Sequence, residues 1–315
     1  MAVFRIQHIT KYIYESPVAE SVNELRIFPM PSPEQEVLQH DLIITGNPEV
    51  QQYSDYWGNR SGFFNVLEGH QELKVESRLL VRTIPTVFSA DLMKGTFQDL
   101  QTSIHDSLLL LELVRPESIE GQQMINQICD EASTGSDSVA EAVEACNSYI
   151  FQHFKYTKGI TTIETTVDEI LKHREGVCQD FAHVLLQMLR TIGIPCRYVS
   201  GYICPNKNGM RGEGATHAWV EAYIPGIGWK GIDPTNNIWV SDNHVKLAVG
   251  RNFKDCTPVK GTFKGSTRQH LFVYVSVGYE DGHVFEETNE VKMGSIDAPT
   301  VTEAELLSAM AAQQQ

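Results

Sequence analysis

The chain has 315 residues, of which 42% are hydrophobic and 21% are charged, and its formal net charge is −15. This composition is typical of a folded globular protein and excludes a largely disordered chain. An acidic surface repels phosphate backbones and anionic lipids, so we expect neither nucleic acid nor a membrane as a partner. No window approaches the roughly 18 consecutive apolar residues of a membrane span, and the N-terminus lacks the basic and apolar segments of a secretory signal.

Six cysteines are scattered along the chain, without a C-x-x-C pair and without histidines at zinc-finger spacing. The sequence also lacks a calcium loop of the EF-hand type, so we predict neither a metal nor a cofactor. A chain of this length folds without disulfides, and scattered thiols are typical of a reducing compartment, so we predict a cytoplasmic protein. The cysteines are Cys129, Cys146, Cys178, Cys196, Cys204 and Cys256.

The first part of the chain has the pattern of β-structure. Apolar and polar residues alternate in residues 4–9 and in parts of 37–45 and 73–81, and turn-forming residues cluster at 58–62 between them. Short strands at this spacing predict a β-sandwich-like N-terminal region over residues 1–100.

Helical periodicity follows this β-rich part. Residues 117–132, 138–154 and 165–193 carry apolar side chains three and four positions apart. We therefore place a core of helices and strands at residues 101–295, followed by a C-terminal tail at 296–315. The strands predicted within this core lie at 197–203, 217–224, 229–233 and 271–279.

A cysteine stands where one of these helices begins. Gly176 interrupts the preceding segment, apolar residues of 181–192 share one helical face, and Gly193 with Pro195 ends the helix, so Cys178 lies in the first turn. The unpaired N–H groups of a helix start carry about half a positive charge, which favours a thiolate. They can also stabilise an oxyanion on a substrate carbonyl. Considered alone, Cys178 is equally well explained as a small buried residue.

A β-hairpin follows, with His217 at its start and Asp233 at its end. A wide turn or a bulge would put both side chains on one face of the hairpin, with Trp219 opposite Gly231. A tight turn over residues 225–228 would put them on opposite faces. Cooperation between the histidine and the aspartate therefore requires the wider turn or the bulge.

Cys178, His217 and Asp233 together have the composition of a catalytic triad. In such an arrangement Asp233 fixes the tautomer of His217, which holds the cysteine as a thiolate and later protonates the leaving amine. Taken singly, His217 also fits a histidine at a strand end, and Asp233 fits an Asp-Pro turn. The three residues occur in the order Cys, His, Asp, which favours the triad.

Four linked segments resemble the core of the transglutaminase-like superfamily, a relative of the papain fold. They are residues 176–182, 189–202 and 217–221, and the pair Gly228-Trp229 with 233–235. The likeness extends to both sides of this core. Residues 8–14 and 24–29 are similar to the N-terminal β-region of bacterial transglutaminase-like candidate cysteine proteases, and residues 250–255 and 258–261 to a loop that follows the core.

The resemblance implies an α+β fold with a papain-like, transglutaminase-like core. In this core the helix that bears the nucleophile packs on an antiparallel sheet, and an N-terminal all-β domain is attached. It also implies a cysteine protease, amidase or transglutaminase-like enzyme that uses Cys178, His217 and Asp233. Such an enzyme is an amide hydrolase or acyl transferase that forms a thioester with a peptide or protein substrate. The alternative is an inactive scaffold or binding module with the same fold.

Three further residues are candidates for the oxyanion site or the cleft, namely Tyr156, Gln179 and Trp219. The tryptophan or glutamine that supplies the second oxyanion donor in related enzymes is not evident at a matching position. Tyr156 is a possible substitute, although it also fits a core residue. The sequence does not choose among hydrolysis, transamidation and deamidation, and it does not specify an oligomeric state or the role of the β-region.

Overall fold

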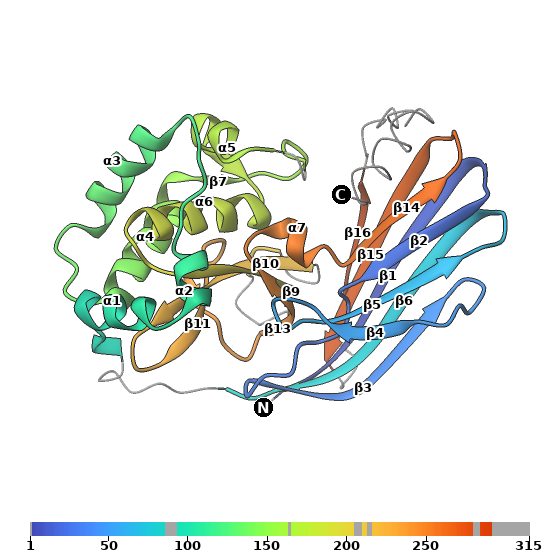
Figure 1. Ribbon diagram of the computed structural model, residues 1–315, viewed down its shortest axis with the longest axis horizontal. Coiled ribbons are helices and arrows are strands. Elements are labelled where there is room, and N and C mark those ends of the chain that lie inside the picture. The colour runs from blue at the N-terminus through green and yellow to red at the C-terminus, as the bar shows by residue number, and fades with distance from the viewer. Residues whose placement is uncertain are drawn as a thin grey trace, which may run out of the picture.

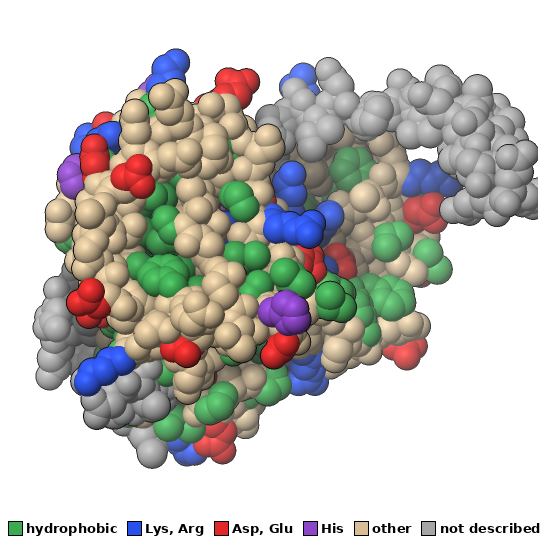
Figure 2. Space-filling model, turned by 60° about the vertical axis from the view of Figure 1, so that its left-hand side comes forward, with side chains coloured by type: hydrophobic (Ala, Val, Ile, Leu, Met, Phe, Trp, Pro, Cys, Tyr) green, Lys and Arg blue, Asp and Glu red, His purple; other side chains and the backbone are tan. Residues whose placement is uncertain are grey.

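The computed structural model describes residues 2–85, 93–162, 165–204, 210–212 and 216–279, and the backbone of 284–291. A helix-rich half lies beside a half built from long strands (Figure 1). In the described part of the chain, no helix is long and apolar enough to cross a membrane. Acidic and basic side chains are interspersed over the face seen in Figure 2, so the negative net charge does not form a single patch there.

The strands of the β-region are β1 (Ala2–Val18), β2 (Glu20–Leu25), β3 (Gln35–Ile44), β4 (Gln51–Ser54), β5 (Arg60–Val66), β6 (His70–Thr83), β14 (Val259–Lys264), β15 (Gln269–Tyr279) and β16 (Val284–Val291). They form two antiparallel sheets with the orders β16-β15-β1-β6-β3 and β14-β2-β5-β4. Both sheets contribute apolar side chains, such as Tyr12, Leu73 and Phe64, to one buried cluster. The region is therefore a two-layered β-structure with its own core.

The last strands of the chain belong to this β-region. Phe4 pairs with Tyr279, and Leu25 pairs with Val259. The structure thus corrects the expected extent of the core, because residues from 259 onward complete the β-region instead. Alternation of apolar residues predicts a strand but not its partner, which non-local packing selects. The boundary near residue 100 stays a prediction, and the tail at 296–315 lies outside the described residues.

The helix-rich half contains α1 (Phe97–His105), α2 (Leu108–Leu113), α3 (Gln122–Ser133), α4 (Val139–His153), α5 (Val167–His173), α6 (Cys178–Thr191) and α7 (Phe253–Cys256). Its strands are β7 (Lys155–Tyr156), β8 (Glu175–Gly176), β9 (Cys196–Ile203), β10 (Thr216–Ile224), β11 (Gly228–Asp233), β12 (Ile238–Trp239) and β13 (His244–Gly250). Five of these strands form an antiparallel sheet with the order β12-β11-β10-β9-β13. Leu185 and Met188 of α6 pack with Val220 and Ile224 of β10, so the cysteine-bearing helix lies on an antiparallel sheet. This part of the predicted architecture is confirmed.

The expected helix over 165–193 is two helices. Arg174 adopts a left-handed conformation, with φ of 52°, and ends α5; the short strand β8 then leads into α6. Helical periodicity on both sides of a short break looks continuous in sequence, which explains the difference. At the other end of α6, Gly193 has φ of 81° and the N–H of Ile194 bonds the carbonyl of Leu189, as expected for a glycine that ends a helix.

The start of α6 is fixed by a buried carboxylate. Asp180 Oδ2 accepts hydrogen bonds from the N–H of Val177, at 2.8 Å, and from the hydroxyl of Thr161, at 2.7 Å. A Cβ placed on Gly176 would lie 2.6 Å from the same oxygen, so only glycine leaves room for this contact. The carboxylate of Asp180 therefore satisfies one backbone donor at the helix start, two residues after Cys178.

Candidate active site

The hairpin register places His217 and Asp233 on one face of the sheet. Ile224 pairs with Gly228 and Glu221 pairs with Gly231, so the turn contains only the three residues between Ile224 and Gly228. The expected pairing of Trp219 with Gly231 is therefore wrong, and the tight turn over 225–228 is also not formed. Continuing the observed register puts Asp233 opposite Trp219. His217 is then its diagonal neighbour on the same face.

A buried ion pair results from this register. His217 Nε2 lies 2.8 Å from Asp233 Oδ2, and neither side chain is exposed to solvent. Burial by itself lowers the pKa of His217, but the charges of Asp233 and Cys178 and hydrogen bonding to both raise it to about 10. Burial acts to raise the pKa of Asp233, but His217 and the hydrogen bonds hold it well below its usual range. The imidazole is thus positively charged at neutral pH.

Cys178 is the first residue of α6 and is half-buried, whereas the other five cysteines are fully buried. Its thiol acts on the His217 ring both through charge and as a hydrogen-bonding group. Among the described residues, Nδ1 of His217 has no hydrogen-bond partner of good geometry. The thiol therefore lies near the ring but is imperfectly aligned with it, which is common in such pairs when no substrate is bound.

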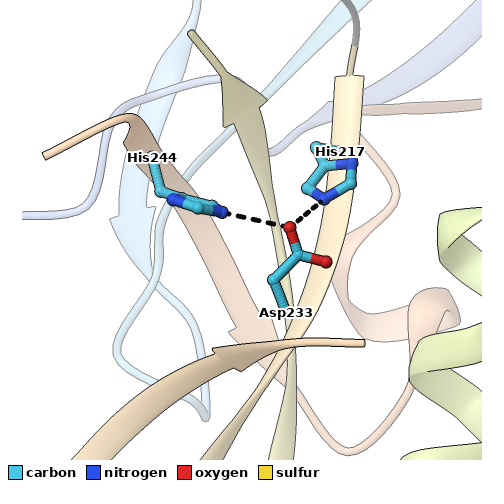
Figure 3. A group of neighbouring side chains, drawn as sticks. All are labelled: His217, Asp233 and His244. Atoms are coloured by element: carbon cyan, nitrogen blue, oxygen red, sulfur yellow. Dashed lines mark hydrogen bonds and ion pairs between the residues drawn. The ribbon is translucent and has the colours of Figure 1, made fainter. Parts of the chain in front are cut away.

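Three further groups bind the carboxylate of Asp233. The N–H of Thr235 donates to Oδ1 at 2.8 Å, and the side-chain amide of Asn236 donates to Oδ2 at 2.8 Å. His244 Nε2 lies 3.3 Å from Oδ2, so two imidazoles meet at one oxygen (Figure 3). None of these three partners was predicted from the sequence. Alternation in residues 244–250 was an available signal for β13, but nothing local indicates that its first residue reaches Asp233.

Two imidazoles and a carboxylate also form a set of possible metal ligands. Ligand atoms of His217, Asp233 and His244 all lie within 4.8 Å of one another. Divalent transition metals bind such sets in proteins. However, both imidazole nitrogens face one carboxylate oxygen at hydrogen-bonding distance, and Asn236 donates to the same oxygen. The arrangement is therefore a hydrogen-bond network whose atoms also meet the spacing of a metal site.

Tyr156 lies close to the histidine. It pairs in β7 with Gly176 of β8, and its ring packs edge-on against Phe181 at a centroid distance of 6.2 Å. A Cβ placed on Gly212 would lie 3.8 Å from the Tyr156 hydroxyl and 3.1 Å from His217 Nδ1. The tyrosine hydroxyl and the imidazole therefore converge on the same point beside Gly212.

The other two cleft candidates lie in different surroundings. Gln179 is half-buried in the first turn of α6, next to Cys178. Trp219 has no exposed surface, and its ring stacks on that of His217 with centroids 6.3 Å apart and an interplanar angle of 30°. The structure therefore places Trp219 behind the histidine, where it supports the ring and offers no surface to a substrate.

Gly212 provides a first test of this geometry. Gly212 has φ of 80°. Gly226, in the hairpin turn, has a similar φ of 82°, but a Cβ added to it would have no neighbouring atom within 4 Å. We expect Gly212→Ala and Gly226→Ala each to lower the free energy of unfolding by about 1 kcal/mol, the cost of a left-handed alanine. Only Gly212→Ala should slow reaction of Cys178 with iodoacetamide, by about 3- to 10-fold, because its methyl group crowds Nδ1. Equal rates in the two variants would contradict this geometry.

The fold and this constellation define a protein of the transglutaminase-like class. The model of the transglutaminase-like superfamily core matches residues 126–234, and the model of the bacterial transglutaminase-like N-terminal region matches residues 4–82. The chain belongs to the transglutaminase-like superfamily, and the fold class expected from sequence is confirmed.

Several individual proteins are similar to this chain. The chain is 31% identical over 277 residues to an uncharacterized protein of Mycobacterium leprae, which covers 87% of this chain and 97% of the relative. It is 37% identical over 97 residues to a protein-glutamine gamma-glutamyltransferase of Pseudomonas aeruginosa, covering 28% of this chain and 14% of that protein. A candidate cysteine protease from Cytophaga hutchinsonii has a similar crystal structure, with a TM-score of 0.69, 21% identity, and coverage of 93% of this chain and 92% of that one.

Proposed function

We propose that this protein is a cysteine-dependent amide hydrolase or acyl transferase with Cys178 as nucleophile, His217 as acid and base, and Asp233 as the orienting carboxylate. One observation carries the proposal. A charged, fully buried histidine–aspartate pair acts on the only half-exposed thiol among the six cysteines, and this thiol stands at a helix start. A scaffold that had lost its chemistry would have no need to keep a buried pair of charges, which is expensive to desolvate.

The reaction follows from these positions. The thiolate of Cys178 attacks the carbonyl carbon of an amide, forming a C–S bond and a tetrahedral oxyanion. The free N–H groups at the start of α6 and the hydroxyl of Tyr156 are the proposed donors to this oxyanion. His217 then gives its proton to the nitrogen as the C–N bond breaks, and a thioester remains. Water or an amine next loses a proton to His217 and attacks the thioester, which releases the acyl group and the thiolate.

The proposed substrate is an amide of a peptide or protein. The name of the Pseudomonas relative supports acyl transfer from glutamine as one outcome, although that similarity is confined to a part of the core. Hydrolysis is preferred here, because we find no amine-donor site in the described part of the chain. Incubation with glutamine peptides and a fluorescent primary amine separates the two outcomes: ammonia release alone indicates hydrolysis or deamidation, and amine incorporation indicates transfer. We also propose a reducing, cytoplasmic location, with which six free thiols agree.

Selective alkylation tests the proposed nucleophile. Burial raises the pKa of Cys129 to about 12 and of Cys196 to about 11, and it also raises the pKa of Cys146, Cys204 and Cys256. We therefore expect iodoacetamide at pH 6 to modify Cys178 alone in the folded protein, at least about 100-fold faster than any other thiol. Peptide mapping by mass spectrometry gives the six rates. Slow and equal modification of all six would contradict the enzyme and favour a scaffold or binding module.

A further inference from the structure

A second histidine binds the carboxylate that orients His217. His244 is the first residue of β13, its side chain has no exposed surface, and its Nε2 lies 3.3 Å from Asp233 Oδ2. Burial lowers the pKa of His244, so its ring is neutral at neutral pH. A neutral imidazole carries one proton, and the nearby carboxylate places that proton on Nε2. His244 is therefore a neutral donor to the anion, whereas His217 is its cationic partner.

This contact joins strands that are not neighbours. In the sheet order β11-β10-β9-β13, two strands separate Asp233 from His244. The two side chains nevertheless meet over the face of the sheet (Figure 3). Any shift of β13 along β9 would therefore withdraw a hydrogen-bond donor from Asp233.

The β-region holds the outer edge of β13. The side-chain amide of Gln35 accepts from the N–H of Lys246 at 2.8 Å and donates to its carbonyl at 2.8 Å. Asn59 makes the same two contacts with Val249, at 2.8 Å and 2.7 Å. Both amides are buried or nearly so. Two side chains thus supply the pairing that a further strand would give, and they fix β13 two and five residues beyond His244.

We propose that His244 is a positioning residue for Asp233, and that the β-region sets the place of His244 through Gln35 and Asn59. The β-region is then part of the active-site framework and not only a recognition module. The inference rests on the proposed function, since it concerns the carboxylate of the same triad. His244 does not touch the reacting atoms, because it acts on them only through Asp233 and His217.

A metal centre is the competing explanation for the same atoms. It would need the ligand nitrogens of both histidines to be free of protons and directed at one ion. Instead, the Nε2 atoms of both histidines are directed at one oxygen of Asp233 at hydrogen-bonding distance, 2.8 Å and 3.3 Å. Positioning is therefore the inference that the observed contacts support, and metal binding is one outcome of the test.

The test compares full-length variants in which His244 is changed. His244→Phe keeps an aromatic ring of similar size and removes the donor, whereas His244→Gln can return an N–H to nearly the same place. His8→Phe is the matched control, because His8 is also a buried neutral histidine, bonded to the Tyr202 hydroxyl of β9 at 2.9 Å, but it has no contact with Asp233. The measurement is the second-order rate of Cys178 alkylation from pH 4.5 to pH 9.

We expect Cys178 to be alkylated about 3- to 10-fold more slowly in His244→Phe than in the wild type at pH 5. The acidic limb of the rate profile should also move to higher pH. Asp233 gains a proton more readily when it loses a donor, and His217 then loses its charged partner. The alkylation rate of His244→Gln should lie within about twofold of the wild-type rate, and His8→Phe should have the wild-type rate profile. Gln35→Leu should change the profile in the same direction as His244→Phe, but less.

The charged groups facing this network are His217, Asp242, and the buried cluster of Glu221 with Arg197 and Lys246.

Two results would overturn the inference. A His244→Phe profile that superimposes on the wild type, with a lowered unfolding midpoint, would make His244 a structural residue only. Stoichiometric Co²⁺ binding by the wild type with a tetrahedral spectrum, lost in His244→Phe, would make the cluster a metal centre. If wild-type Cys178 proves unreactive, the proposed function fails separately. The inference is then tested by NMR, in which the Nε2–H of His217 should exchange faster in His244→Phe than in His8→Phe, and equal exchange would overturn it.

Discussion

His217→Ala should slow alkylation of Cys178 at pH 5 by about 10- to 100-fold and should have little effect near pH 8. A cationic imidazole beside a thiol assists its reaction most in acid, because an ordinary cysteine has a pKa near about 8.5 and is almost wholly protonated at pH 5. A thiolate without a cationic partner is more nucleophilic, which offsets part of the loss as the pH rises. The two rate profiles should therefore converge in mild alkali. Measurement of both profiles between pH 4.5 and pH 9 checks this expectation.

His183→Ala is the control for this experiment. His183 lies on the same helix as Cys178, but its Nε2 accepts a hydrogen bond from the N–H of Phe253 and its ring packs against Tyr198. Its loss should leave the alkylation profile unchanged. A uniform reduction at every pH in His217→Ala would show that the histidine affects only access to the thiol, and the ion pair would then be refuted.

Asp233→Asn should have the second large effect, because it removes the charge that keeps His217 protonated. Turnover should fall by roughly 10³- to 10⁴-fold, as expected when a triad carboxylate becomes an amide and the imidazole takes the wrong tautomer. The pH dependence of stability should change as well. In the wild type, the pKa of His217 is raised from 6.5 to about 10, so its contribution to stability is complete below pH 6.5 and is lost as the pH rises through about 10.

In Asp233→Asn, only Cys178 is left to oppose burial, which is the largest influence on His217 and lowers its pKa. The variant should therefore lose stability as the pH falls below 6.5. Urea unfolding at intervals from pH 5 to pH 10 measures this reversal. Glu221→Gln is the matched control: Glu221 is a buried carboxylate of the same sheet face, bonded to Arg197 and Lys246. Neither partner is a histidine, so the control should be less stable without a reversed slope. Parallel stability profiles for wild type and Asp233→Asn would refute the assigned charge state of His217.

Local sequence signals were sufficient to place Cys178 at the start of its helix. A glycine, a cysteine and an amphipathic run define α6, and the features that start and end it are all within about 20 residues of one another. The hairpin was also evident, since its strands alternate and its turn is short. The register of the hairpin was not evident, because residues 224–228 are compatible with several turns. In the observed register, Ile224 pairs with Gly228, and the ring of Trp219 stacks on that of His217. A shift of register changes every pairing but leaves the sequence pattern intact.

The partners of the carboxylate depend on non-local structure. His244 reaches Asp233 only because β9 and β10 separate β11 from β13 in the sheet, and sequence periodicity does not specify strand order. The same reason explains why the last strands were assigned to the core. Their alternation is visible, but their pairing with β1 and β2 depends on contacts across more than 200 residues of chain.

The pairing of the first long strand with one of the last has a consequence for biosynthesis. β1 pairs with β15 from Phe4 opposite Tyr279 to Tyr14 opposite Gln269, so one edge of β1 has no partner until residues 269–279 have left the ribosome. Exposed strand edges attract other chains, and closure over such a sequence separation is slow. The first sheet of the nascent protein therefore stays open on one side while the residues between β6 and β15 are synthesised.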